Sequence, residues 1–182
     1  DILLCNRGPY GTWTKAKSIS RTINTDGNEA SIVLSADGQQ LYVYRDDNGD
    51  GNIYVSELQD TVFADLNKVA EVNTISWETH LTLTPDGNTI YFVSDREGGL
   101  GGRDIYRITK LPNGKWSAPM NVGAPVNSKY DEDAPFIHAD GVSLYFSANN
   151  DKSMGGFDIY LSQINEEGKF SEREHRARAR QR

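Results

Sequence analysis

The sequence predicts an all-β protein built from repeated blades of four antiparallel strands, the unit of a β-propeller. Two segments, 78–117 and 132–171, align without a gap at a constant offset of 54 residues. The first 44 residues align in the same way with residues 104–147. Short apolar runs separated by Asp-Gly and Gly-rich turns recur in every copy, and no helical pattern of any length interrupts them.

The copies share chemically specific positions. An Asp-Gly pair precedes an aromatic strand, and an acidic residue stands eight positions before that pair. The pairs are Asp37-Gly38, Asp86-Gly87 and Asp140-Gly141, and the acids are Glu29, Glu78 and Glu132. Fixed spacings of this kind predict one structural unit used several times.

One copy shows how each element of a blade arises. Residues 80–84 alternate apolar and polar side chains, as a half-buried strand does, and residues 85–88 form a hairpin turn. Residues 89–94 are aromatic and β-branched, which predicts a strand buried on both faces. After a Gly-rich loop, residues 104–108 form the third strand, and a turn leads to a fourth strand at Trp116.

The blade count falls short of a closed ring. The expected blades are 1–16 (the last two strands only), 29–66, 78–120 and 133–171, followed by an Arg-rich tail, 172–182, that does not match the repeat. About three and a half blades are fewer than the four to eight of a closed propeller. The sequence therefore predicts a partial propeller or one completed by a homo-oligomer, in which two copies complete a seven-bladed ring.

Composition excludes several classes of protein. The net charge is -7, and residues 173–182 hold five Arg and one Glu, so the preceding body is more acidic still. An acidic body does not neutralise phosphates, which argues against a nucleic-acid partner. No apolar run reaches the roughly 18–20 residues of a membrane span. The single cysteine, Cys5, excludes an internal disulfide and is interpreted as a strand cysteine rather than a lipidation site.

The repeat motifs resemble those of one known group. They are the acidic stretch ending in Pro at 130–135, the Asp-Gly and aromatic strand at 140–147, Gly-Gly-Phe-Asp-Ile-Tyr at 155–160, and Gly-Lys-Trp-Ser onward at 114–126. Together they resemble the WD40-like (TolB-type) propeller repeats of OmpA-family envelope proteins of Bacteroidetes. The resemblance covers residues 1–171.

That resemblance implies a function and a location. It implies a non-enzymatic protein-interaction scaffold of the bacterial cell envelope, periplasmic and associated with the outer membrane through a longer parent protein. The implied partners are envelope proteins, with peptidoglycan association supplied by domains outside this sequence. Fold alone does not establish function, so these remain expectations.

The clearest local motif is a calcium-type loop. With Asp46 as the first position, it fits D-x-[DN]-x-[DN]-G-x5-E in full. The ligands would be Asp46, Asn48, Asp50, Asn52 and Glu57. Alternating oxygen ligands around a Gly turn suit Ca²⁺, which is the one cofactor that the sequence suggests. The flanking residues are strands rather than helices, and a polar hairpin loop is the alternative interpretation.

Other polar clusters are interpreted as structural. Asp131-Glu132-Asp133 is read as a solvated acidic run in which the repeated acid has a structural role. Asp104 and Asp158 recur in register and are expected to hydrogen-bond within their blades. His80 and His138 lie at strand positions near turns and are interpreted as structural or exposed.

No nucleophile motif is present, so we predict a protein that is not an enzyme. Two alternatives stay open. One is a propeller fragment of a hydrolase of the glycosidase or prolyl-oligopeptidase type, with chemistry in another domain. The other is a calcium-dependent binding module.

Overall fold

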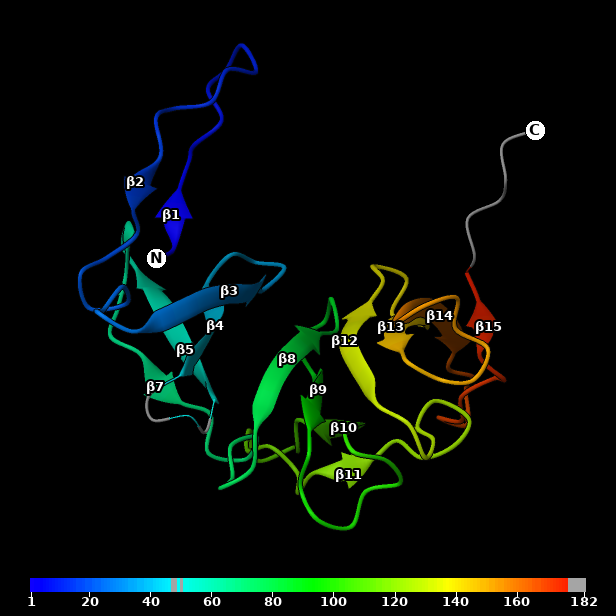
Figure 1. Cartoon of the computed structure of the whole chain (residues 1–182). Helices are drawn as coiled ribbons and strands as arrows, with labels where there is room; N and C mark the ends of the chain where they lie inside the picture. Colours follow the sequence, from blue (N-terminus) through cyan, green and yellow to red (C-terminus); the bar gives the residue numbers. More distant parts are fainter. Residues whose placement is uncertain (47–48, 50, 177–182) are drawn as a thin grey trace.

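The computed structural model describes residues 1–46, 49 and 51–176, and every regular element among them is a β-strand (Figure 1). Accordingly, no helix in the described part is long and apolar enough to cross a membrane. The strands form successive antiparallel sheets that curl around one side of the molecule, which is a partial β-propeller.

Four sheets follow the chain, and we name them the half-blade and blades 2, 3 and 4. The half-blade pairs β1 (Leu3–Leu4) with β2 (Lys17–Ser18). Blade 2 holds β3 (Asn28–Leu34), β4 (Gln40–Asp46), β5 (Asn52–Gln59), β6 (Val62–Phe63) and β7 (Asn67–Lys68). Blade 3 holds β8 (Glu78–Leu83), β9 (Thr89–Ser94), β10 (Asp104–Thr109) and β11 (Met120–Asn121). Blade 4 holds β12 (Glu132–Ile137), β13 (Ser143–Ala148), β14 (Asp158–Gln163) and β15 (Glu174–His175).

The fourth strand of each blade is short and lies later than the sequence indicates. Trp116 makes only an isolated bridge to Lys110, and the paired strand is β11, with Asn121 opposite Tyr106. In blade 4 the equivalent strand is β15, with His175 opposite Tyr160. The blade therefore continues into the segment 172–182 that was expected to be a non-repeat tail. A two-residue outer strand is too short to show an alternating side-chain pattern in the sequence.

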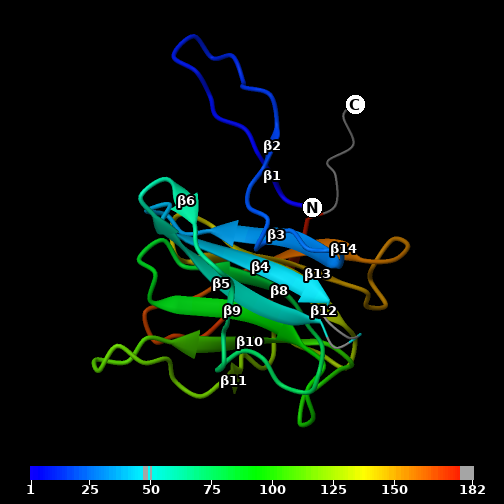
Figure 2. The same cartoon turned by 90° about the vertical axis from the view of Figure 1, so that its left-hand side faces the viewer.

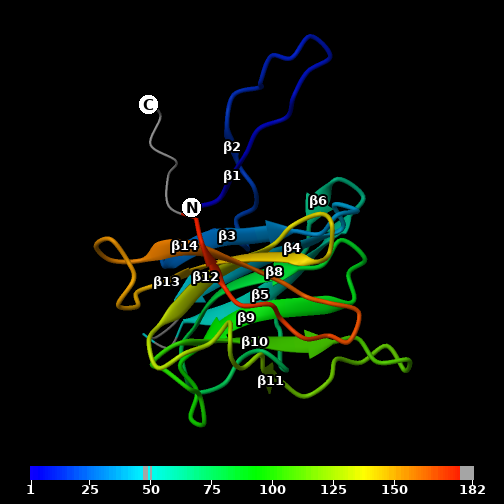
Figure 3. The same cartoon turned by 90° about the vertical axis from the view of Figure 1, so that its right-hand side faces the viewer.

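The first strands β3, β8 and β12 line the concave side, and the later strands of each blade lie progressively outward (Figure 1). The side views show the half-blade hairpin projecting away from the stacked blades (Figures 2 and 3). Hydrophobic cores lie between successive blades rather than inside them. The core between blades 2 and 3 includes Ile53 and Phe92, and that between blades 3 and 4 includes Ile105 and Phe146. Burying each such side chain contributes about 1.5–3 kcal/mol.

A repeated asparagine fixes the third strand of three sheets. Asn127 accepts a hydrogen bond from the Ile105 N–H at 2.9 Å and donates one to the Ile105 carbonyl at 2.8 Å. Asn24 and Asn73 bind Ile2 and Ile53 in the same way. The amide side chain thus satisfies both backbone groups of one residue, as a neighbouring strand would.

The repeated acid is also structural, as the sequence indicates. Glu78 and Glu132 are fully buried, and each accepts hydrogen bonds from the hydroxyl and N–H of the residue four positions earlier, Thr74 or Ser128. The expectation for Asp104 is confirmed as well, because it accepts from the Leu100 N–H and from the Asn121 amide. Asp158 contacts the Met154 N–H and His175 in the same manner.

Candidate functional site

Comparison of the repeats distinguishes side chains that recur in every blade from side chains that occur in one blade only. Side chains that recur in register, such as the Asn and Glu above, hold blades together. Side chains that depart from the repeat and still form connected networks are candidates for function. Three of them meet at the junction of blades 3 and 4, namely His80, Arg103 and Asp133. His80 and Arg103 of blade 3 correspond to Ala134 and Phe157 of blade 4, and Asp133 of blade 4 corresponds to Thr79 of blade 3.

Irregular first strands bring this group to the concave side. The pairing register shifts in all three first strands, between Ser31 and Val33 in β3, between Glu78 and Leu81 in β8, and between Asp133 and Phe136 in β12. The shift is therefore part of the repeat, and it re-aims the side chains of each first strand. In β12 it includes Ala134, which has φ of 47°, a left-handed conformation that is uncommon for a residue other than glycine.

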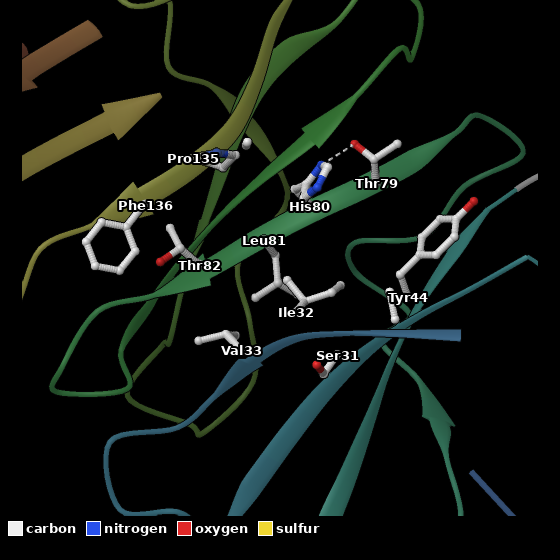
Figure 4. Close-up of a pocket in the computed structure, with 12 residues that line it drawn as sticks. Ser31, Ile32, Val33, Tyr44, Thr79, His80, Leu81, Thr82, Pro135 and Phe136 are labelled. Atoms are coloured by element: carbon white, nitrogen blue, oxygen red, sulfur yellow. Dashed lines mark hydrogen bonds between the residues drawn. The ribbon is translucent and has the colours of Figure 1, made fainter. Parts of the chain in front are cut away.

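An open cavity of about 470 Å³ lies between β3, β8 and β12. Figure 4 shows Ile32 and Val33 of β3 and Leu81 of β8 on its apolar side. The remaining lining residues are Ala30, Ser31, Tyr44, Thr79, His80, Thr82, Ala134, Pro135 and Phe136. None of the lining residues is Asp, Glu, Lys or Arg, so the cavity suits apolar or neutral groups with one polar end.

At that polar end His80 and Asp133 form a close pair. The His80 Nδ1 lies 2.9 Å from the Asp133 Oδ1 and 3.1 Å from the Thr79 hydroxyl. The Asp133 side chain is 13% exposed, whereas that of His80 is 50% exposed. The other Asp133 oxygen accepts a hydrogen bond from Arg103 at 2.5 Å.

The carboxyl group of Asp133 is held ionised. Burial opposes its ionisation, but the hydrogen bonds from His80 and the Ala134 N–H, with the nearby charges, outweigh burial and lower its pKa. An ionised carboxylate only accepts hydrogen bonds, so the His80 Nδ1 is the donor. In the neutral imidazole Nε2 then carries the lone pair, on a half-exposed ring beside the cavity.

This arrangement corrects one interpretation from the sequence. The acidic run 131–133 is not a solvated loop, because Glu132 and Asp133 are buried and Asp131 accepts from the Arg103 N–H. His80 is half-exposed, in line with its interpretation as structural or exposed, and it also lines the cavity. By contrast, His138 lies at the turn after β12, 3.1 Å from Asp140.

The predicted calcium loop is only partly described. Asn48 and Asp50 lie outside the described residues. Asp46 accepts a hydrogen bond from the Gly49 N–H at 2.6 Å, and Asn52 is buried in β5. Glu57 pairs with Gln40 at the far end of the same hairpin. Five residues of strand span roughly 16 Å, so the structure does not bring Glu57 to the loop.

No other metal site emerges from the described part of the chain, where no three acidic, His or Cys side chains are grouped to hold an ion. Cys5 is free and exposed, and it lies just after β1, which corrects its interpretation as a strand cysteine. The strand pairing of β1 with β2 stops at Leu4.

Comparison with solved structures shows a TolB-like propeller fold. The chain matches a protein assigned as TolB from Agrobacterium tumefaciens with a TM-score of 0.60 and 16% identity, over 95% of this chain and 59% of that one. It matches TolB from Acinetobacter baumannii with a TM-score of 0.56 and 14% identity, over 93% of this chain and 37% of that one. A protein assigned as a 6-phosphogluconolactonase from Bacteroides uniformis matches with a TM-score of 0.51 and 17% identity, over 92% of this chain and 48% of that one.

The chain thus spans three fifths or less of the length of each of these structures. No protein-family model matches the sequence, and no curated protein matches it significantly.

Proposed function

We propose that the chain belongs to a non-enzymatic protein-interaction scaffold of the bacterial cell envelope, and that its concave cavity holds an extended apolar segment of a partner protein. The observation that supports this most is the cavity itself. Strands from three blades line it, its walls are apolar, and its polar end is built from residues that the repeat does not require.

The location belongs to the same proposal. The resemblance of the repeat motifs supports a periplasmic location for the chain, as part of a longer OmpA-family protein. Other domains of that protein would hold it to the outer membrane and to peptidoglycan. The TolB-like fold is consistent with this location.

A blocked cavity tests the binding proposal. Ala30 is exposed and lines the cavity, so Ala30→Trp fills the cavity without disturbing a core. Ala70 is exposed at the end of blade 2, away from the cavity, so Ala70→Trp is the matched control. Peptides are selected from a displayed library on the native chain, and their affinities are measured by fluorescence anisotropy.

We expect apolar peptides of micromolar affinity, weakened at least about tenfold by Ala30→Trp and unchanged by Ala70→Trp. If no peptide is selected, or if both variants bind selected peptides as the native chain does, the binding proposal is wrong.

The His80–Asp133 pair supports one alternative, a hydrolase-type propeller. In that function the His80 Nε2 accepts a proton from water as the water oxygen attacks the carbonyl carbon of a neutral ester or lactone. The proton then passes to the departing oxygen. Asp133 orients the imidazole and stabilises its protonated form.

A panel of esters and lactones separates the two functions. A hydrolase loses about 10²–10⁴-fold in kcat/KM on His80→Gln, because the general base is removed. His138→Gln is the matched control, since that histidine lies at a turn outside the cavity. Turnover no faster than in buffer, for every substrate, eliminates the hydrolase alternative.

A further inference from the structure

The start of β8 differs from the corresponding point in the other full blades. The residue just before the buried repeat acid is Asn28 in blade 2 and Asp131 in blade 4, but it is Trp77 in blade 3. Trp77 is 49% exposed. Tryptophan is enriched among the residues that dominate binding energy at protein interfaces. An exposed indole that the repeat does not require is therefore a candidate contact for a partner.

The indole ring of Trp77 is held in one position. Its Nε1–H donates a hydrogen bond to the Tyr44 hydroxyl at 3.1 Å. The ring lies on Gly51, where any side chain would collide with it. Blades 3 and 4 carry Arg103 and Phe157 at that position, so of the three full blades only blade 2 leaves room for the ring. A side chain that is already fixed loses little conformational entropy when a partner binds.

A carboxylate lies beside this ring. The Asp95 Oδ1 accepts a hydrogen bond from the Trp77 N–H at 2.8 Å. In blade 4 Asn149 makes the same contact with the Asp131 N–H at 2.9 Å, and its amide also donates to the Asp131 side chain. The backbone contact therefore needs only an amide oxygen, yet blade 3 uses a charged group. Asp95 is exposed, and within the described residues its Oδ2 takes part in no hydrogen bond or ion pair.

Asp95 also has no cationic partner in the described part of the chain. The adjacent Arg96 turns inward, where its Nη2 donates to the buried Glu78 at 3.2 Å. Asp133, at the other side of the cavity, already has Arg103 as its ion-pair partner. An exposed carboxylate without a counter-ion, in a chain of net charge -7, attracts a positively charged group.

An aromatic face with a carboxylate beside it suits a cationic side chain. Among aromatic rings, the face of an indole attracts Arg and Lys cations most strongly. The planar guanidinium of an arginine stacks on aromatic rings and donates in a fork to carboxylates. The site adjoins the concave cavity, because Tyr44, which binds the Trp77 ring, also lines that cavity (Figure 4).

We propose that Trp77 and Asp95 bind a basic side chain of the partner segment whose apolar residues occupy the cavity. We name these two residues the basic-residue site. This inference rests on the proposed function and specifies its partner, which is an extended segment with apolar residues next to an arginine or lysine. The cavity supplies the apolar contact, and the basic-residue site supplies specificity, as charged contacts at the edge of an interface do.

A nearly isosteric substitution tests the site without changing its backbone contact. Asp95→Asn removes the charge and keeps an oxygen for the Trp77 N–H, as Asn149 does in blade 4. Asp151→Asn is the matched control, because Asp151 is exposed in the corresponding loop of blade 4 and the net charge changes equally. The probes are the peptides selected from a displayed library on the native chain, each also synthesised with its basic residue replaced by glutamine. Fluorescence anisotropy gives each Kd, and circular dichroism confirms that each variant is folded.

We expect the selected peptides to carry an arginine or lysine next to their apolar residues. On the native chain and on Asp151→Asn, replacing this basic residue by glutamine should raise the Kd about threefold to tenfold. On Asp95→Asn the same replacement should raise the Kd less than about twofold, because the carboxylate is already gone. Trp77→Leu should weaken the basic peptides about threefold, because the cation loses the ring face.

The possible outcomes separate this proposal from the proposed function. Suppose that peptides bind and Ala30→Trp weakens them, but glutamine in place of the basic residue has no effect. The basic-residue site is then wrong, and the cavity remains the binding site. Equal effects of Asp95→Asn and Asp151→Asn would also overturn the site, because net charge alone would then attract the peptides. If no peptide is selected, the proposed function fails and this inference fails with it.

Discussion

Single side chains that repeat in register carry the backbone geometry of each blade. Asn127 is 2% exposed and is the buried partner of both backbone polar groups of Ile105. A recurring Asn is visible in the sequence at 24 and 127, but its partner is not. The partner lies 22 residues away on β10, and the two residues come close only after the sheet has formed.

Removing that side chain is expected to be costly. Asn127→Ala leaves the N–H and the carbonyl of Ile105 buried without partners, and each costs about 1–3 kcal/mol. We expect urea unfolding to show a loss of roughly 2–4 kcal/mol. Asn113→Ala is the control, because Asn113 makes a similar backbone contact in an exposed turn. Equal losses for both variants would contradict a special role for the buried site.

The aspartates of the Asp-Gly turns make stability depend on pH. A hydrogen bond from the Ser35 hydroxyl lowers the pKa of Asp37, and one from the Thr84 hydroxyl lowers that of Asp86. Backbone N–H groups within its own turn lower the pKa of Asp140. The pKa of each aspartate is lower in the folded chain than in the unfolded chain. Its contribution to the free energy of unfolding is therefore fully present above about pH 3.8 and is lost as the pH falls through the folded-state pKa.

We therefore expect the free energy of unfolding to decrease as the pH is lowered below about 4. Urea titrations at a series of acidic pH values measure this decrease. In Asp86→Asn the decrease of the free energy of unfolding at acidic pH is expected to be smaller, because the amide does not titrate. An identical pH profile for the variant would show that this turn contributes nothing to acid sensitivity.

At the scale of elements, local signals and long-range pairing were predictable to different degrees. The hairpin turns could be predicted because Asp-Gly chemistry is local, and Gly87 has the positive φ of 69° that such a turn requires. The bulges in β8 and β12 could not, because they depend on register against a partner strand. The candidate site shares this limit, since His80 and Asp133 are 53 residues apart and belong to different blades.

The last strand shows how an element can be completed without the repeat. Arg96 donates to the buried Glu78 in blade 3. Its equivalent in blade 4 is Asn150, and Arg173 instead reaches the buried Glu132 at 3.1 Å, just before β15. Burial raises the pKa of Glu132, against the opposing hydrogen bonds of Ser128 and the charge of Arg173. The arginine that accompanies β15 is therefore a counter-ion for the core of its blade.

Losing that counter-ion should destabilise the blade through Glu132. Arg173→Met removes the charge while keeping much of the side-chain volume, and we expect a loss of about 3 kcal/mol. Glu132→Gln in the same chain should recover part of this loss, because no buried charge is left uncompensated. A double-mutant cycle of unfolding free energies measures the coupling. A coupling near zero would mean that the two side chains act independently.

For the whole molecule, stability should vary along the row of blades. Blade 3 is covered on both faces, and Phe92 and Val93 of β9 are fully buried. The half-blade has two short strands, and Leu3 in β1 is 59% exposed. When each repeat contacts only its neighbours, stability is approximately a sum of repeat and interface terms, so an end repeat opens more easily than a middle one.

We expect amide hydrogen exchange of the native chain to be slowest in β9 and β10 and fastest in β1 and β2. Uniform protection from β1 to β14 would instead show that the partial propeller opens as one cooperative unit. In that case the interfaces between blades, rather than the blades, would set its stability.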